Sequence, residues 1–407
     1  MRIRAIILAG CVAVSLTVLN AVDKGDFDPA SFPAEKKEDV EAIAAVFRKF
    51  PKNADVLYQV AAMHARAGHR EEALDLLTQM MKLGTGLDPR SRNFGTLAED
   101  KQFKIVKATI RKQNPPVIAT RLAYQIDEGD LTPEGIAFSE KTHKFYLGGK
   151  RKIVSLAEDG KYEQFVAPGT GGLGDPVGIR VDDSRGKLWV VSNAVGQRKP
   201  DMVLGLFCFS LTDGKLIKVY EIHEADQELL NDVAVMKDGS AYATASVSGA
   251  LWKADPVTGK VEKFLPDKSL PDPNGIFATP DGKYLLVAGW YGITRVDVRK
   301  RRTELLDKPV NVADGCLDGM YLYGDKIIGV QNCNHETGRI MEFEVKVDYR
   351  QITKARVLAS YDPIFDGITT AAIAGDQLYF VANTQMRKMG KAGEKFDPLK
   401  VVRLSLK

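Results

Sequence analysis

The strongest constraint on this chain is a short strand motif that recurs six times after residue 117. Each copy is a mostly apolar strand that begins at one reference position: Glu134, Val177, Asn231, Asn274, Asp318 and Thr369. Successive reference positions lie 43, 54, 43, 44 and 51 residues apart, and a second strand begins eight to ten residues after each. This period and its strand–turn–strand content are typical of propeller blades. We therefore predict an all-β six-bladed β-propeller over residues 117–407, preceded by a small α-helical segment.

The two ends of the repeat region predict how the propeller closes. The C-terminal run from Val401 to Leu406 has the pattern of a third strand in blade six, and no fourth strand follows it. The segment from Ile118 to Ile126 precedes the first repeat and has the composition of a strand. We expect it to supply the missing outer strand, because this pairing removes an open sheet edge.

Residues 22–116 have a helical pattern instead. Apolar residues recur with a period of about 3.6 from Lys36 to Phe50 and again from Ala54 to Met81. The second stretch has a glycine turn at Gly68 and resembles one tetratricopeptide repeat. One such unit cannot bury its own apolar face, so we expect it to pack on the propeller or on a protein partner. The prolines of the 114–116 segment mark the boundary.

The N-terminus predicts export. Arg2 and Arg4 precede an apolar run from Ala5 to Leu19, as in a signal peptide over residues 1–21 cleaved after Ala21. The expected location is periplasmic or secreted. A membrane anchor and a lipoprotein modified at Cys11 are the alternatives.

Charge and cysteine content exclude two classes of function. The formal charge is only +4 and falls to +2 if the two leader arginines are removed, so no nucleic-acid partner is expected. After the leader, three cysteines remain, at positions without zinc-like spacing: Cys208, Cys316 and Cys333. A single disulfide between Cys316 and Cys333 is compatible with an oxidising compartment, and the sequence leaves this pairing open.

The six reference positions also predict a metal site. Inner strands of a propeller begin at the same face beside the central channel, so these six residues converge. Four of them carry carboxylate or amide oxygens, which are ligands that hard cations prefer: Glu134, Asn231, Asn274 and Asp318. Ca²⁺ is the expected ion, with Zn²⁺ and Mg²⁺ as alternatives, and Asp314 is an alternative ligand to Asp318. The competing interpretation is that Asn and Asp occupy turns before glycine and bind no metal.

The repeat motifs resemble the senescence-marker-protein, gluconolactonase and luciferin-regenerating-enzyme family (regucalcin-like). The likeness covers roughly residues 117–407 and consists of four dipeptides in the family's order, one per blade: Glu134-Gly135, Asn231-Asp232, Asn274-Gly275 and Asp318-Gly319. It implies a central divalent metal held by the first residue of each pair, and lactonase or esterase activity. The distantly related paraoxonases carry two histidines where this chain has Val177 and Asn193, so their histidine dyad is absent.

The resemblance implies that Asp318 is the general base in hydrolysis of a lactone or ester. His335 is the histidine placed to move a proton, and an ordinary loop position is its alternative. Loops on the metal face would form the substrate pocket with Asn193, Trp290, Tyr291, Asn332 and Asn383. The expected partner is a small molecule. The alternatives are a non-catalytic propeller that binds a ligand or protein around a structural cation, and a propeller without metal.

Overall fold

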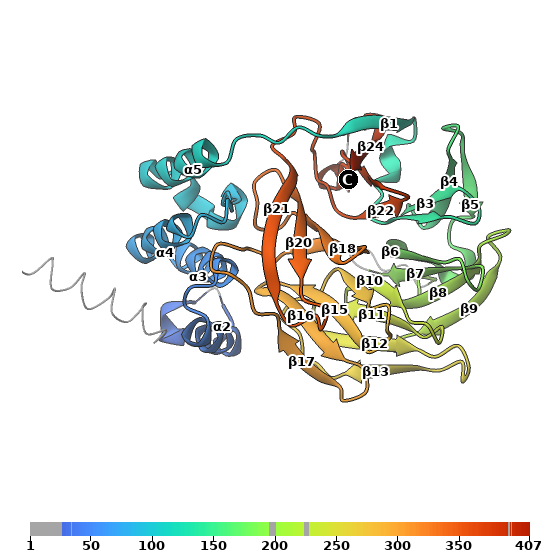
Figure 1. Ribbon diagram of the computed structural model, residues 1–407, viewed down its shortest axis with the longest axis horizontal. Coiled ribbons are helices and arrows are strands. Elements are labelled where there is room, and N and C mark those ends of the chain that lie inside the picture. Colours follow the sequence, from blue (N-terminus) through green and yellow to red (C-terminus); the bar gives the residue numbers. More distant parts are fainter. Residues whose placement is uncertain (1–26, 34, 195–200, 224–227, 390, 392) are drawn as a thin grey trace, which may run out of the picture. The chain divides into compact units, whose positions relative to one another are not determined.

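The computed structural model describes residues 27–407 except 34, 195–200, 224–227, 390 and 392 (Figure 1). The predicted signal peptide over residues 1–21 lies outside the described residues. The chain divides into two compact units. The first comprises the described residues up to Pro115 with Val310–Ala313 and Asn334–Glu336, and the second comprises the described residues of Pro116–Pro309, Asp314–Cys333 and Thr337–Lys407. No helix in the described residues is long and apolar enough to span a membrane.

The first unit is helical. Its described helices are α2 (Lys37–Lys49), α3 (Ala54–Arg66), α4 (Arg70–Lys82) and α5 (Lys101–Gln113), with short 3₁₀ turns at Pro29–Ser31 and Ser91–Glu99. Asn53 caps α3 by accepting hydrogen bonds from the backbone N–H groups of Asp55 and Val56. Between α3 and α4, Gly68 takes a positive φ of 82° that favours glycine. The predicted helix–turn–helix is therefore present.

A polar network lies inside the first unit. The Lys107 ammonium donates hydrogen bonds to the Pro89 carbonyl (2.7 Å) and to Ser91 Oγ (2.9 Å), and it pairs with Glu336. Arg111 Nε donates to Oδ2 of the buried Asp88 at 2.7 Å. These contacts tie α5 to the segment before the second 3₁₀ turn.

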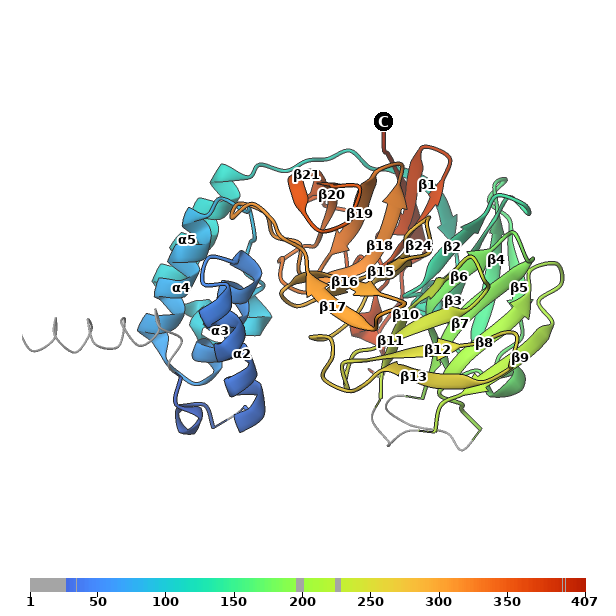
Figure 2. The same cartoon turned by 60° about the horizontal axis from the view of Figure 1, so that its bottom comes forward.

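The second unit consists of six four-stranded antiparallel sheets in the described residues, which confirms the six-bladed propeller (Figure 2). The first three blades have their strands in sequence order from the centre outward. Blade 1 contains β2 (Ile136–Ser139), β3 (Lys144–Gly149), β4 (Lys152–Ala157) and β5 (Tyr162–Val166). Blade 2 contains β6 (Asp175–Asp182), β7 (Lys187–Asn193), β8 (Gly205–Ser210) and β9 (Leu216–Glu221). Blade 3 contains β10 (Leu230–Val235), β11 (Ala241–Ala245), β12 (Ala250–Ala254) and β13 (Val261–Leu265).

The remaining blades complete the ring. Blade 4 contains β14 (Ile276–Ala278), β15 (Tyr284–Gly289), β16 (Gly292–Asp297) and β17 (Arg302–Leu305). Blade 5 contains β18 (Leu317–Tyr323), β19 (Lys326–Gln331), β20 (Arg339–Val345) and β21 (Ile352–Ser360). Blade 6 contains β22 (Ala371–Ala374), β23 (Gln377–Val381), β24 (Leu399–Ser405) and β1 (Arg121–Ile126).

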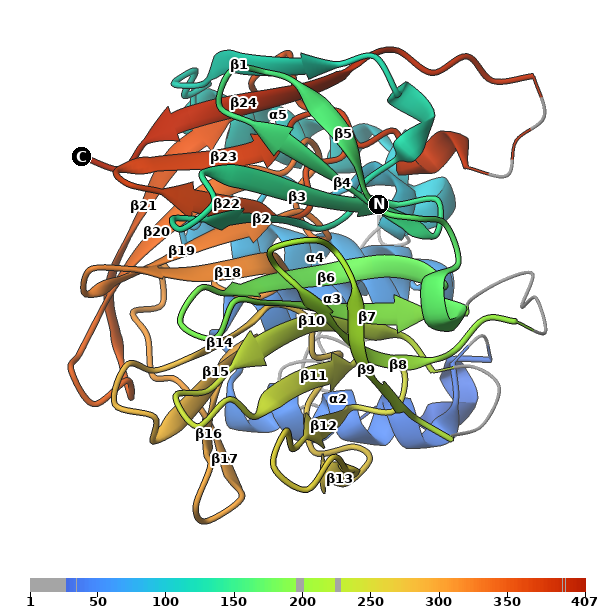
Figure 3. The same cartoon turned by 90° about the vertical axis from the view of Figure 1, so that its right-hand side faces the viewer.

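Blade 6 joins the two ends of the repeat region. Strand β1 pairs antiparallel with β24, and Ile126 is opposite Leu399 (Figure 3). The sequence therefore predicted the closing strand correctly. Its pairing converts the C-terminal edge of the sheet into an interior strand.

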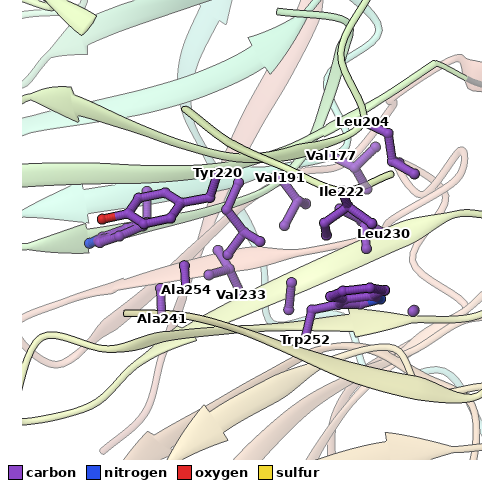
Figure 4. Packing of buried hydrophobic residues seen from close by; sticks show 14 of the residues in the cluster. Val177, Val191, Leu204, Tyr220, Ile222, Leu230, Val233, Ala241, Trp252 and Ala254 are labelled. Carbon is purple, nitrogen blue, oxygen red and sulfur yellow. The ribbon is translucent and has the colours of Figure 1, made fainter. Parts of the chain in front are cut away.

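Apolar side chains between neighbouring blades form the propeller core. Between blades 2 and 3, Val191 and Leu230 are fully buried and pack with Trp252 and other residues of both sheets (Figure 4). Blade 2 lies between two such layers: Leu188 and Val190 belong to the layer shared with blade 1, and Trp189 and Val191 to the layer shared with blade 3. Packing of this kind holds neighbouring blades together.

Candidate functional site

The six reference positions meet in a ring at the start of the inner strands. A Cβ atom on Gly135 would lie 2.1 Å from the Val177 carbonyl oxygen, so only glycine permits blades 1 and 2 to approach this closely. A Cβ atom on Gly178 would likewise lie 2.6 Å from the Asn231 carbonyl oxygen. The glycine after each of these two reference residues therefore allows its backbone to approach the reference residue of the next blade.

The other four junctions close the ring. At one of them, a Cβ atom on Gly275 would lie 2.7 Å from the Asp318 carbonyl oxygen. The remaining three are hydrogen bonds: Ile276 N–H to Asp232 Oδ2 (3.1 Å), Ala371 N–H to Tyr321 Oη (2.7 Å) and Thr369 Oγ1 to the Glu134 carbonyl (2.9 Å). Every junction between consecutive blades is thus made at or near a reference position. The four predicted metal ligands consequently belong to one ring.

Glu134 is the ring residue with the most unusual surroundings. Its carboxylate is half-buried and has neither a hydrogen bond nor an ion pair within the described residues. Burial raises the pKa of Glu134 to about 8, and repulsion from Asp318 and Asp232 adds to this effect. A carboxylate in this position favours a cation or a proton.

The two asparagines offer amide oxygens. Asn274 Oδ1 is buried and accepts no hydrogen bond in the described structure. The Asn231 amide donates from Nδ2 to Ser246 Oγ at 3.2 Å, which fixes its orientation and leaves its oxygen available to a cation. A buried carbonyl oxygen without a donor costs free energy, and a bound cation would remove that cost.

Asp318 completes the predicted ligand set. Its Oδ2 accepts a hydrogen bond from Asn332 Nδ2, and the same amide group donates to the Ile368 carbonyl at 2.9 Å. Asn332 therefore holds the Asp318 carboxylate in one orientation. Asp314, the alternative ligand, accepts from the backbone N–H of Ile293 at 2.9 Å and pairs with Lys308. These contacts favour a structural role for Asp314.

The donor set fits a hard cation only if amide oxygens take part. The described residues contain no group of three or more His, Cys, Asp or Glu side chains that could hold a metal ion. The predicted ligand set contains only two such side chains, Glu134 and Asp318. Together with the two asparagine amides, however, it offers only oxygen ligands, which are the ligands that Ca²⁺ prefers. This chemistry disfavours Zn²⁺, which prefers nitrogen and sulfur ligands.

A small cavity of about 40 Å³ adjoins Asn274 and contains part of the predicted pocket. It is lined by Asp272, Asn274, Gly289, Trp290, Cys316, Leu317, Asn332 and Cys333. Cys316 and Cys333 form a disulfide in its wall, which settles the pairing that the sequence left open. The cavity can hold a water molecule or a small reacting group, but not a whole sugar lactone.

Asp272 is a residue of this cavity that was not predicted from the sequence. The Trp290 side chain donates a hydrogen bond to its carboxylate. Burial nevertheless raises the pKa of Asp272 to about 6, and the charge of Asp318 adds to the shift. The two aromatic pocket candidates differ in exposure, since Trp290 is 41% exposed and Tyr291 is buried.

Two other pocket candidates bind backbone groups with their amides. Asn193 bridges to Leu230, donating to its carbonyl (2.6 Å) and accepting from its N–H (2.8 Å). Asn383 donates to the Pro398 carbonyl and accepts from Lys400 N–H at 2.7 Å. Both side chains hold loops in place. His335 is buried and belongs to the first unit. Its role in proton transfer stays a prediction.

Arg180 and Asp232 are channel residues whose role was not predicted from the sequence. Arg180 Nη2 donates to Asp232 Oδ2 at 3.1 Å, and the guanidinium lies 5.2 Å from the ring centre of Tyr321. Two departures from the repeat pattern could have indicated this pair from the sequence. Asp232 stands where four other blades have glycine, and Arg180 is the charged residue three positions after a reference residue.

Comparison with known proteins gives similarity of fold alone. No family model and no curated protein matches the sequence. Among solved structures, a gluconolactonase from Xanthomonas campestris has a TM-score of 0.49 at 15% identity and covers 71% of this chain and 89% of its own. A regucalcin from Agrobacterium tumefaciens, described as calcium-binding, has a TM-score of 0.48 at 17% identity, with 70% and 93% covered.

Propellers with other functions are equally similar. The pyrroloquinoline-quinone-bound aldose sugar dehydrogenase from Streptomyces coelicolor has a TM-score of 0.48 at 12% identity and covers 72% of this chain and 99% of its own. The solved structures thus include members of the family named from the sequence motifs, alongside others. At these identities, a function has to be argued from the residues of the channel.

Proposed function

We propose that this chain is a metal-dependent hydrolase that acts on a lactone or ester at the propeller axis. One observation carries the proposal: the Glu134 carboxylate has acidic neighbours in the channel and no hydrogen-bonded or ion-paired partner in the described structure. Asp232, the third carboxylate nearby, has Arg180 as its counterion. Glu134 and Asp318 would together supply the two negative charges that balance a divalent cation.

The ligands of this cation would be Glu134, Asn231, Asn274 and Asp318. When bound, a divalent ion supplies positive charge that polarises a carbonyl group and stabilises negative charge on its oxygen. Asp318 would accept a proton from the attacking water, as a general base held in orientation by Asn332. The small cavity beside Asn274 would admit the reacting carbonyl, while the rest of the substrate stays outside.

The size of the cavity also favours a second candidate function. A space of about 40 Å³ suits bound water better than a substrate, and the amides of Asn193 and Asn383 are occupied by backbone groups. The second candidate is a non-catalytic propeller that binds a small molecule or a protein, with the cation as a structural element. The helical unit would then provide the surface for a protein partner.

The disulfide supports export. Disulfides persist in oxidising compartments and are rare in the cytosol. The Cys316–Cys333 bridge therefore agrees with the proposed periplasmic or secreted location.

The first experiment measures bound metal and thermal stability of the mature protein with and without chelator. One Ca²⁺-like ion per chain is expected, and chelation should lower the melting temperature. Glu134→Gln should abolish both the ion and the chelator response. Glu163→Gln, which removes an exposed carboxylate from an outer strand of blade 1, should leave both intact. A wild-type protein without ion or chelator response would overturn the site.

A screen of lactones and esters then separates the two candidate functions. For a hydrolase, Asp318→Asn should lose activity while the protein remains folded. Absence of hydrolysis across the screen, with one bound ion and a chelator response, would support the structural cation instead.

A further inference from the structure

Two arginines lie directly opposite each other in the outer half of blade 6. Arg121 on β1 and Arg403 on β24 are register partners, so their side chains are on the same face of the sheet. Both are exposed. Like charges at directly opposite positions destabilise a strand pair, so this arrangement has a cost that the fold alone does not explain.

The described part of the chain supplies no anion to either arginine. Within the described residues, neither guanidinium makes a hydrogen bond or an ion pair. Asp376 precedes Gln377, the first residue of the neighbouring strand β23. Its carboxylate, however, forms an ion pair with Lys407 and accepts a hydrogen bond from the Tyr323 hydroxyl. The pair is therefore a concentration of positive charge without a counterion among the residues that the structure describes.

The two side chains border an open hollow of about 450 Å³. It is lined by Ala119, Arg121, Gln377, Arg403 and Ser405. Gln377 and Ser405 are themselves register partners, so a side-chain amide and a hydroxyl lie one pair further along the sheet. The hollow lies at outer strands, while the axial ligands lie at inner strands, and the two sites share no residue.

The chemistry of this lining selects the ligand. A guanidinium presents planar N–H donors that match the oxygens of phosphate and sulfate, and such charge-assisted hydrogen bonds are stronger than neutral ones. An amide and a hydroxyl add neutral donors. The volume exceeds that of a single oxyanion and lies in the range of small-molecule pockets.

We propose that this hollow binds the phosphate or sulfate group of a small organic ester through Arg121 and Arg403. The proposal is independent of the axial metal and of hydrolysis. The bound oxyanion would neutralise the opposed arginines, and Gln377 and Ser405 would contact the remainder of the ligand.

The test compares inorganic phosphate, inorganic sulfate and glucose 6-phosphate at constant ionic strength, by calorimetry and thermal unfolding. At least one oxyanion should raise the melting temperature of the wild type above its value in chloride. The ester should bind more tightly than inorganic phosphate because the hollow is larger than the anion. Equal affinities would overturn the assignment to an ester.

Variants separate a site from general charge attraction. Arg403→Gln and Arg121→Gln should each weaken oxyanion binding at least about tenfold, whereas Arg299→Gln, with the same charge change in an exposed turn, should retain it. In chloride alone, Arg403→Gln should be at least as stable as the wild type because the repulsion is removed. Equal weakening by all three variants, or no oxyanion effect on the wild type, would overturn the proposal.

Discussion

Arg180 on the inner strand of blade 2 donates a hydrogen bond of 3.1 Å to Asp232 on the inner strand of blade 3. The same guanidinium donates to the carbonyls of Val233 (3.1 Å) and Ile276 (3.2 Å), and it lies over the ring of Tyr321. One side chain thus contacts blades 3, 4 and 5 across the channel. Its charge compensates Asp232, whose pKa burial would otherwise raise further.

Replacing this arginine should destabilise the propeller. Arg180→Leu leaves Asp232 as a buried carboxylate without its counterion, which typically costs about 3–5 kcal/mol of unfolding free energy. Urea unfolding at neutral pH measures the loss. Adding Asp232→Asn to this variant should recover part of it, because the uncompensated charge is then gone. An unchanged urea midpoint in Arg180→Leu would show that the pair does not stabilise the channel.

Asn332 should control the cation site through Asp318. Asn332→Leu keeps the branched shape of the side chain but removes the donor that orients the Asp318 carboxylate. Loss of a hydrogen bond that orients a metal ligand typically weakens metal affinity or activity by about 10- to 100-fold. Calorimetric titration of the chelated protein with Ca²⁺ tests this expectation, and thermal unfolding in chelator controls for folding. A variant that binds Ca²⁺ as tightly as the wild type would contradict it.

The period of the repeat was sufficient to predict the propeller and its closing strand. Spacings of 43 to 54 residues and mostly apolar strands are properties of each blade by itself, so they are visible in the sequence. The sequence also predicts that Glu134, Asn231, Asn274 and Asp318 converge, because equivalent positions in a rotational repeat occupy equivalent places around one axis. Their role as metal ligands stays a prediction.

The contacts of individual side chains could not be predicted in the same way. The hydrogen bonds that join Asn193 and Asn383 to backbone groups depend on the paths of particular loops. The pairing of Arg180 with Asp232 joins residues of two blades that the repeat treats as equivalent. Departures from the repeat, such as Asp at a glycine position, are the sequence signal for contacts of this kind.

The disulfide should stabilise the propeller through the unfolded state. Cys316 and Cys333 are separated by 17 residues, and closing a loop of this length contributes about 3 kcal/mol when the effect is attributed to chain entropy. A Cys316→Ser, Cys333→Ser double variant should therefore unfold at lower denaturant than the oxidised wild type. Reductant should lower the midpoint of the wild type only. Equal midpoints for the variant and the oxidised protein would exclude this contribution.

His64 should make the helical unit sensitive to mild acid. Burial lowers the pKa of His64 to about 4 from its ordinary value of 6.5, and the neighbouring His69 adds to the shift. The unfolded chain therefore binds a proton between pH 6.5 and 4 that the folded unit does not, so stability is present above pH 6.5 and is lost as the pH falls toward 4. The full loss is roughly 3 kcal/mol. Urea midpoints of the helical circular dichroism signal at pH 7 and pH 5 measure it, and His64→Gln should reduce the difference.

The Glu336 carboxylate, whose pKa falls to about 2 because Lys107 and Ser91 outweigh its burial, loses its contribution only at lower pH, below about 4.5. If the urea midpoint changes between pH 7 and pH 5 by the same amount in His64→Gln as in the wild type, the acid sensitivity belongs to a group other than His64.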